Sequence, residues 1–235
     1  MTRRFQRSVL PGILAGMAAV AALFYLLPGK WNILGNRKPA SEVGRWIAPL
    51  KPSDLNLLLI TLDTTRADHI GCYGYPMIRT PNIDGLAAEG ILFQNATSQC
   101  PLTLPSHSSM FTGTYPFFHG VRDNGGFYLG EDQVTLAEVV RQAGWATSAF
   151  IGAFVLDSRW GVNQGFDYYY DNFDFAKYKK ISLDSVQREG GEVVKAFFEW
   201  FDQNAPQKFF SWIHLYDPHA PYEPPEPFRT QYEGQ

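Results

Sequence analysis

A continuous apolar run, Leu57 to Leu62, ends directly at a carboxylate, Asp63. A run without polar alternation is typical of a strand that is buried on both faces, as in a parallel sheet covered by helices. In open sheets of this kind the carboxyl ends of the strands carry the functional sites. The run therefore predicts an α/β fold in which Asp63 lies at the functional edge of the sheet.

Further predicted elements alternate along the chain. Thr135 and Glu138 have the spacing of a capping box, which predicts the start of a helix at residue 135. Gly190-Gly191 weakens the amphipathic pattern of a second predicted helix, over residues 182–203. The alternation predicts a mostly parallel, doubly wound sheet flanked by helices. The predicted helices cover residues 81–89, 105–111, 135–143 and 182–203, and the predicted strands cover residues 57–62, 91–96, 145–151 and 208–215.

Composition favours a globular protein that does not bind nucleic acid. The chain has 235 residues, of which 45% are hydrophobic, and these suffice for one sizeable core. Its formal net charge of -3 argues against a nucleic-acid partner. The two cysteines, Cys72 and Cys100, can pair in an oxidising compartment, but two cysteines do not make a disulfide framework.

The N-terminus indicates a membrane segment. Three arginines precede an uncharged run from Val9 to Leu27. This run approaches the roughly 20 residues that a helix needs to cross a bilayer, and it exceeds the apolar core of about 7–15 residues in a cleaved signal peptide. We expect a single transmembrane anchor, with a cleaved signal or a buried helix as alternatives. We assign residues 1–30 to the anchor or signal, 31–54 to a linker and 55–235 to a domain outside the cytoplasm, periplasmic or extracellular.

The segment from Thr103 to Gly113 places a hydroxyl just ahead of Pro105. Proline suits the start of a helix, because the N–H that it lacks would be unpaired there. The free N–H groups of a first helical turn attract an anion. From the residues alone, Thr103 is either a helix cap or a nucleophile for a phosphate or sulfate ester. Asp63 is likewise either a turn cap or a ligand of a hard divalent cation.

Four segments in this order resemble the N-terminal part of the sulfatase family, within the alkaline-phosphatase superfamily. They are residues 55–68, 103–116, 119–124 and 214–222. The resemblance runs from Leu55 to the C-terminus and implies an alkaline-phosphatase-like fold. It also implies a metal-dependent hydrolase of sulfate or phosphate esters, with an anionic ester substrate on a glycan, lipid or small molecule.

The resemblance also assigns roles to individual residues. It implies that Thr103 attacks the ester to form a covalent intermediate, and that Asp63 and Thr103 bind a divalent ion such as Ca, Mn or Zn. His219 matches the histidine that can protonate the leaving group. Arg122 can clamp an anionic group, and His107 either contacts the substrate oxyanion or stabilises the loop. His214 ends a predicted strand with its role undecided.

Two departures from the family pattern bear on the chemistry. Thr103 stands where sulfatases carry the cysteine that becomes formylglycine, so we expect no formylglycine here. Asp63 is followed by Thr64, whereas many sulfatases have two consecutive aspartates. A formylglycine hydrate expels sulfate by collapsing to an aldehyde, and a threonine ester has no such exit. We therefore expect phosphate-type chemistry or group transfer.

The chain ends at Gln235, before the Asp-His or Asp-Asn pair that completes the metal site of family members. We expect a truncated catalytic domain, a fragment of a longer enzyme that is inactive alone. Two alternatives to hydrolysis remain open. One is a transferase that moves a phospho-group onto an envelope glycan or lipid, and the other is a non-catalytic fragment or binding protein.

Overall fold

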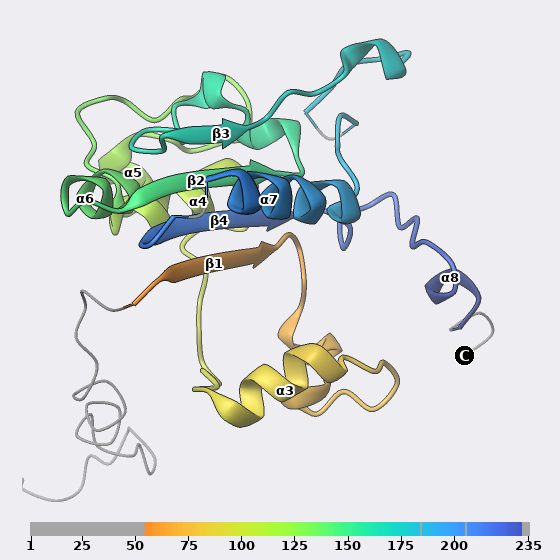
Figure 1. Cartoon of the computed structure of the whole chain (residues 1–235). Coiled ribbons are helices and arrows are strands. Elements are labelled where there is room, and N and C mark those ends of the chain that lie inside the picture. Colours follow the sequence, from red (N-terminus) through yellow and green to blue (C-terminus); the bar gives the residue numbers. More distant parts are fainter. Residues whose placement is uncertain (1–54, 184, 205, 232–235) are drawn as a thin grey trace, which may run out of the picture. The chain divides into compact units, whose positions relative to one another are not determined.

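A computed structural model describes residues 55–183, 185–204 and 206–231. Within these residues four strands form one sheet in the order β1-β4-β2-β3, and every neighbouring pair is parallel (Figure 1). The predicted parallel α/β architecture is therefore confirmed. The strands are β1 (Leu57–Leu62), β2 (Ala146–Ile151), β3 (Tyr168–Tyr170) and β4 (Phe209–Leu215).

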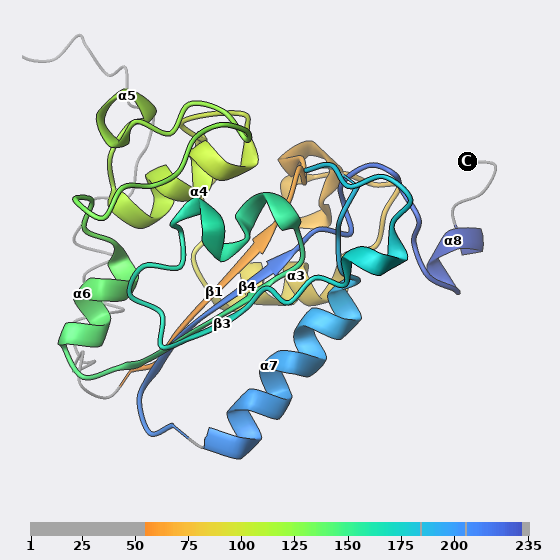
Figure 2. The same ribbon diagram turned by 90° about the horizontal axis from the view of Figure 1, so that it is seen from above.

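Helices cover both faces of the sheet (Figure 2). Helices α4 (Thr103–Thr112) and α6 (Leu136–Gln142) lie on one face, and α7 (Gly190–Asn204) lies on the other. The remaining helices are α3 (Pro81–Glu89), α5 (Pro116–His119) and α8 (Phe228–Gln231). Single 3₁₀ turns cover Ala67–His69, Gly71–Tyr73, Phe154–Leu156, Ser158–Trp160 and Phe175–Lys177.

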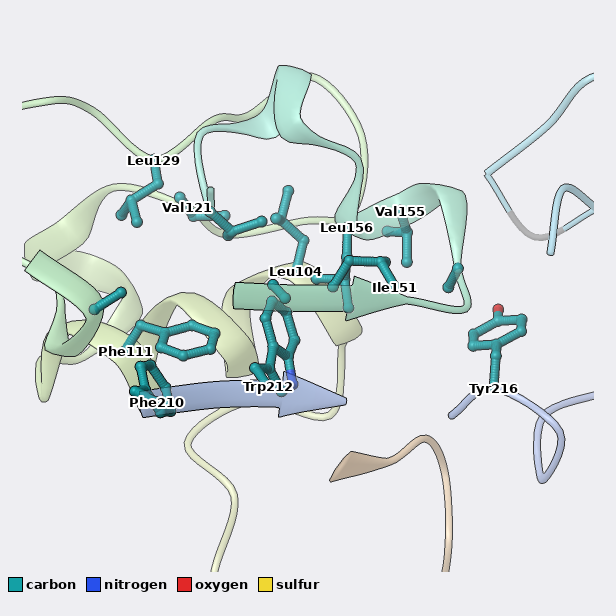
Figure 3. Close-up of a cluster of buried hydrophobic side chains, with 14 residues drawn as sticks. Leu104, Phe111, Val121, Leu129, Ile151, Val155, Leu156, Phe210, Trp212 and Tyr216 are labelled. Carbon is teal, nitrogen blue, oxygen red and sulfur yellow. The ribbon is translucent and has the colours of Figure 1, made fainter. Parts of the chain in front are cut away.

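Each face of the sheet has its own hydrophobic core, because successive side chains of a strand point to opposite faces. On the α4 face, Phe210 and Trp212 of β4 pack with Leu104 and Phe111 of α4 (Figure 3). On the α7 face, Phe150 and Ile213 pack against a stripe of α7 that includes Val193, Ala196 and Phe197. The alternation along β4 therefore places His214 on the same face as Trp212, beneath α4.

Local signals predicted several elements correctly. Helix α3 has the predicted bounds, with a proline at its start and Gly90 after its end. Thr135 and Glu138 form the predicted capping box at the start of α6. Strands β1, β2 and β4 match the predicted runs to within one residue.

Other predictions were wrong. The segment Ile91–Ala96 is not a strand, because it has no ladder partner among the described residues, and Phe93 within it is 68% exposed. The helix predicted from residue 182 begins only at Gly190, whose N–H donates to Asp217 Oδ1 at 3.0 Å. The helix predicted from Pro105 begins two residues earlier, at Thr103.

The predicted anchor and linker, residues 1–54, lie outside the described residues. No helix within the described part of the chain is both long enough and apolar enough to cross a bilayer. Cys72 and Cys100 are half-buried free thiols, so the disulfide considered from the sequence is not formed in this structure.

Candidate functional site

Asp63 lies at the carboxyl end of β1, as the sequence predicts. Its N–H donates to Leu215 O of β4 at 2.9 Å, which prolongs the parallel ladder by one residue. The next residue, Thr64, has a φ of 51°, a left-handed conformation that is unusual for a β-branched residue. The Thr64 hydroxyl donates to Pro218 O at 3.1 Å. The turn after β1 is thereby tied to the loop after β4, and Asp63 is only 7% exposed.

Thr103 is the first residue of α4. Leu102 occupies the N-cap position, and its side chain makes no capping hydrogen bond. The Thr103 hydroxyl instead donates to Asp63 Oδ2 at 3.0 Å, so the interpretation of Thr103 as a helix cap is wrong. The neighbouring Leu104 N–H donates to Asn124 Oδ1 at 2.9 Å, which satisfies one of the free donors of the first turn.

Two buried histidines lie behind this pair. His107 Nδ1 is 2.7 Å from Thr103 O, and because a carbonyl only accepts, Nδ1 must carry the proton. The ring of His107 stacks on that of His214 at 5.0 Å between centroids. His214 Nε2 is 3.4 Å from Asp63 Oδ2.

Burial keeps both imidazoles neutral. Removal from water lowers the pKa of His107, against the opposing influence of its bond to Thr103 O. Burial lowers the pKa of His214 well below its ordinary value, and the neighbouring His107 lowers it further. The contact of His214 with Asp63 is therefore not an ion pair at neutral pH.

A cavity of about 460 Å³ opens over this group of residues. Asp63, Thr103 and His107 line it, so the structure brings together three of the five residues that the sequence analysis assigned to the site. Arg122 is exposed and does not line this cavity. His219 is also outside the lining, with its ring stacked on Tyr216 and its Nδ1 2.6 Å from Ala220 O. The other lining residues are Thr61, Leu62, Thr64, Thr65, Ser98, Cys100, Pro101, Leu102, Ser106 and Met110.

The donor set fits part of a hard-cation site. Asp63 and Thr103 present a carboxylate and a hydroxyl to the same cavity, both of them oxygen ligands. A buried carboxylate that contacts a hydroxyl and a neutral imidazole is a favourable place for a cation, whose charge would offset the cost of burying the carboxylate. Within the described residues no group of three or more His, Cys, Asp or Glu side chains could hold a metal ion. Asp63 and Thr103 are thus only part of the six to eight oxygens that calcium takes.

Comparison with known families identifies the chain. The sequence model of the Sulfatase family matches residues 55–235. The chain belongs to the sulfatase family. Among curated relatives, this sulfatase-family chain is 33% identical to human arylsulfatase D over 49% of the chain and 22% of the relative. It is 29% identical to human N-acetylgalactosamine-6-sulfatase over 80% of the chain and 38% of the relative. It therefore spans well under half the length of these two relatives.

Solved structures agree with this placement in the alkaline-phosphatase superfamily. A protein solved with its substrate D-glucosamine-2-N,6-O-disulfate superposes with a TM-score of 0.57 and 27% identity, over 72% of this chain and 35% of that protein. A phosphonate monoester hydrolase of Agrobacterium radiobacter superposes with a TM-score of 0.61 and 21% identity, over 74% and 43%. At 21% identity the second likeness concerns the fold alone.

Proposed function

We propose that this chain forms the nucleophile half of a hydrolase for sulfate or phosphate esters, with Thr103 as the attacking residue. The observation that carries the proposal is the 3.0 Å hydrogen bond from Thr103 Oγ1 to Asp63 Oδ2, at the wall of a cavity. A serine or threonine hydroxyl is a weak nucleophile unless a neighbouring group takes its proton or a metal activates it. Asp63 is placed to take the proton.

The proposed step balances as follows. A bond forms from Thr103 Oγ1 to the phosphorus or sulfur atom, and the bond from that atom to the ester oxygen breaks. The hydroxyl proton moves to Asp63, and the departing alcohol takes a proton from an acid, the role we propose for His219. Water then hydrolyses the threonine ester. Arg122 remains our proposed clamp for the anion.

The threonine itself favours phosphate over sulfate as the transferred group. A threonine ester must be cleaved by water or by a second acceptor, because it has no aldehyde exit. The relatives named above, which include human N-acetylgalactosamine-6-sulfatase, favour an anionic ester on a sugar. We therefore propose a glycan or similar alcohol that carries a phosphate or sulfate group, handled by a membrane-anchored domain outside the cytoplasm.

We further propose that Asp63 and Thr103 contribute ligands to a divalent cation. The buried carboxylate and the two oxygens facing one cavity support this proposal. When bound, such an ion would lower the pKa of the hydroxyl and neutralise developing charge.

The test measures hydrolysis of p-nitrophenyl phosphate and p-nitrophenyl sulfate by the intact, full-length protein that contains this chain, with Ca²⁺, Mn²⁺ or Zn²⁺ added in turn. Thr103→Ala should lower kcat by at least about 10³-fold, the order seen when a nucleophile is removed. Thr103→Ser should retain turnover, because it keeps the hydroxyl. Ser106→Ala is the matched control, since it removes another hydroxyl from the same cavity.

Equal turnover by wild type and Thr103→Ala would refute the proposed nucleophile. Turnover that appears only when an alcohol acceptor is added would favour the transferase alternative. Wild type with no turnover of either ester under any of these conditions would favour the non-catalytic alternative.

A further inference from the structure

His214 occupies a central place behind the site although it does not line the cavity. It lies on β4, opposite Thr61 of β1 and Ile151 of β2 in the parallel register. Its side chain points to the α4 face, in line with Trp212, and is fully buried. From this position the ring can contact both the end of β1 and the first turn of α4.

The contacts of His214 reach both members of the proposed catalytic pair. Its Nε2 lies 3.4 Å from Asp63 Oδ2, the atom that accepts the hydroxyl of Thr103. Its ring stacks on His107 at an interplanar angle of 22°. His107 in turn donates to Thr103 O at 2.7 Å. The two histidines therefore link the carboxylate to the backbone of the nucleophile.

Folding alone gives no reason for an imidazole at this position. Neither ring nitrogen of His214 has a hydrogen-bond partner within the described residues. An unpaired buried polar group costs free energy, and an apolar ring of the same shape would avoid that cost. A costly polar group that touches a reactive carboxylate is better explained by a role in the site.

We propose that His214 is a positioning residue, which holds Asp63 through Nε2 and the first turn of α4 through the ring of His107. This inference rests on the proposed function. The Nε2–H is the group that would face the carboxylate, and a small tilt of the ring would turn the 3.4 Å contact into a hydrogen bond. Without it, the Asp63 carboxylate is free to leave the hydroxyl of Thr103.

Two substitutions separate positioning from packing. His214→Phe keeps an aromatic ring for the stack and removes the N–H, whereas His214→Gln keeps a donor near the place of Nε2. We expect His214→Phe to melt at or above the wild-type temperature but to lose about 10- to 100-fold in kcat with KM nearly unchanged, the usual size for outer-shell partners. His214→Gln should recover part of that loss.

Wild-type kcat in His214→Phe would overturn the proposal. So would a loss of kcat that follows a fall in melting temperature and is not recovered by Gln, because that pattern indicates packing alone. A second readout does not need turnover. In ¹⁵N spectra of the full chain, we expect His214 in the Nε2–H form, with its ring signals shifted by Asp63→Ala. Ring signals of His214 that are unchanged by Asp63→Ala would overturn the proposed contact. If Asp63→Ala shifts these signals as expected but the wild-type protein hydrolyses neither ester, the result would count against the proposed function only.

Discussion

The side chain of Asn124 closes the first turn of α4 by accepting the N–H of Leu104 at 2.9 Å. Asn124 lies in the loop after α5, so the helix that carries Thr103 is capped from a distant part of the chain rather than by its own preceding residue. Within residues 119–124 the sequence pointed to Arg122, yet in the structure Asn124 makes the contact with the helix that carries Thr103.

Asn124→Ala should lower the free energy of unfolding by about 1 kcal/mol, the usual cost of losing such an acceptor at a helix start. It should also lower kcat, because the turn that holds Thr103 loosens. Urea unfolding measures the first effect. Asn124→Asp, which keeps the acceptor oxygen, is the control and should stay near wild type in stability.

Asp63→Asn should uncouple activity from stability. The amide keeps an acceptor oxygen for the hydroxyl of Thr103 but removes a buried negative charge. We expect stability within about 1 kcal/mol of wild type or higher, together with loss of turnover and of Ca²⁺ or Mn²⁺ binding. Calorimetric titration with each ion checks the binding, and undiminished binding would exclude Asp63 as a ligand.

The paired serines of the sheet offer a test of buried polar pairing. Ser148 of β2 and Ser211 of β4 are opposite each other, fully buried, and hydrogen-bonded at 2.7 Å between their hydroxyls. Either single alanine substitution should cost about 1–3 kcal/mol, because it leaves the other hydroxyl unpaired. The double alanine variant should be much closer to wild type, and a double loss equal to the sum of the single losses would contradict this.

Stability should fall in mild acid. His119 accepts the Val121 N–H at Nδ1 (3.2 Å) and contacts Ser109 Oγ through Nε2 (2.9 Å), and burial lowers its pKa. The unfolded chain, with a histidine pKa of about 6.5, therefore binds more protons than the native state below that pH. The contribution of His119 is complete above pH about 6.5 and is lost as the pH falls towards the native pKa.

Urea unfolding at pH 7.5, 6.5 and 5.5 measures this loss, which cannot exceed about 1.4 kcal/mol per pH unit for each histidine. His107 and His214 act in the same direction. His119→Gln should therefore reduce the dependence on pH without abolishing it. An unchanged dependence in His119→Gln would contradict this prediction.

Local chemistry explains which parts of the fold were predictable. Some helix ends are marked by residues that act within a few positions. Pro81 and Gly90 mark the two ends of α3, and Thr135 with Glu138 marks the start of α6, and both helices were predicted closely. Strand β3, only Tyr168–Tyr170, was not predicted, since its pairing with β2 defines it. Ile91–Ala96 has strand-like residues, but it pairs with no strand among the described residues, although β1 lies at an edge of the sheet.

The site shows the same division. Asp63 and Thr103 were predicted because each stands at the end of an element whose signal is local. The place of His214 depends on the register and facing of β4, which tertiary packing sets, so the sequence left its role open. The available signal was that His214 stands two residues after Trp212, so both side chains lie on the same face of the strand. The burial of that face depends on α4, which packs over it in the folded protein.

The pairing of β1 with β4 also has a consequence for synthesis of the protein. Asn56 Oδ1 accepts the N–H of Phe209, 153 positions later in the chain. During synthesis, the strand that carries the Asp63 carboxylate is made well before β4, its only sheet neighbour among the described residues. Until β4 has been made, the growing chain therefore exposes an unpaired apolar strand. The contact between Asp63 and His214 can form only after that point, which makes β1 a segment that a chaperone would protect.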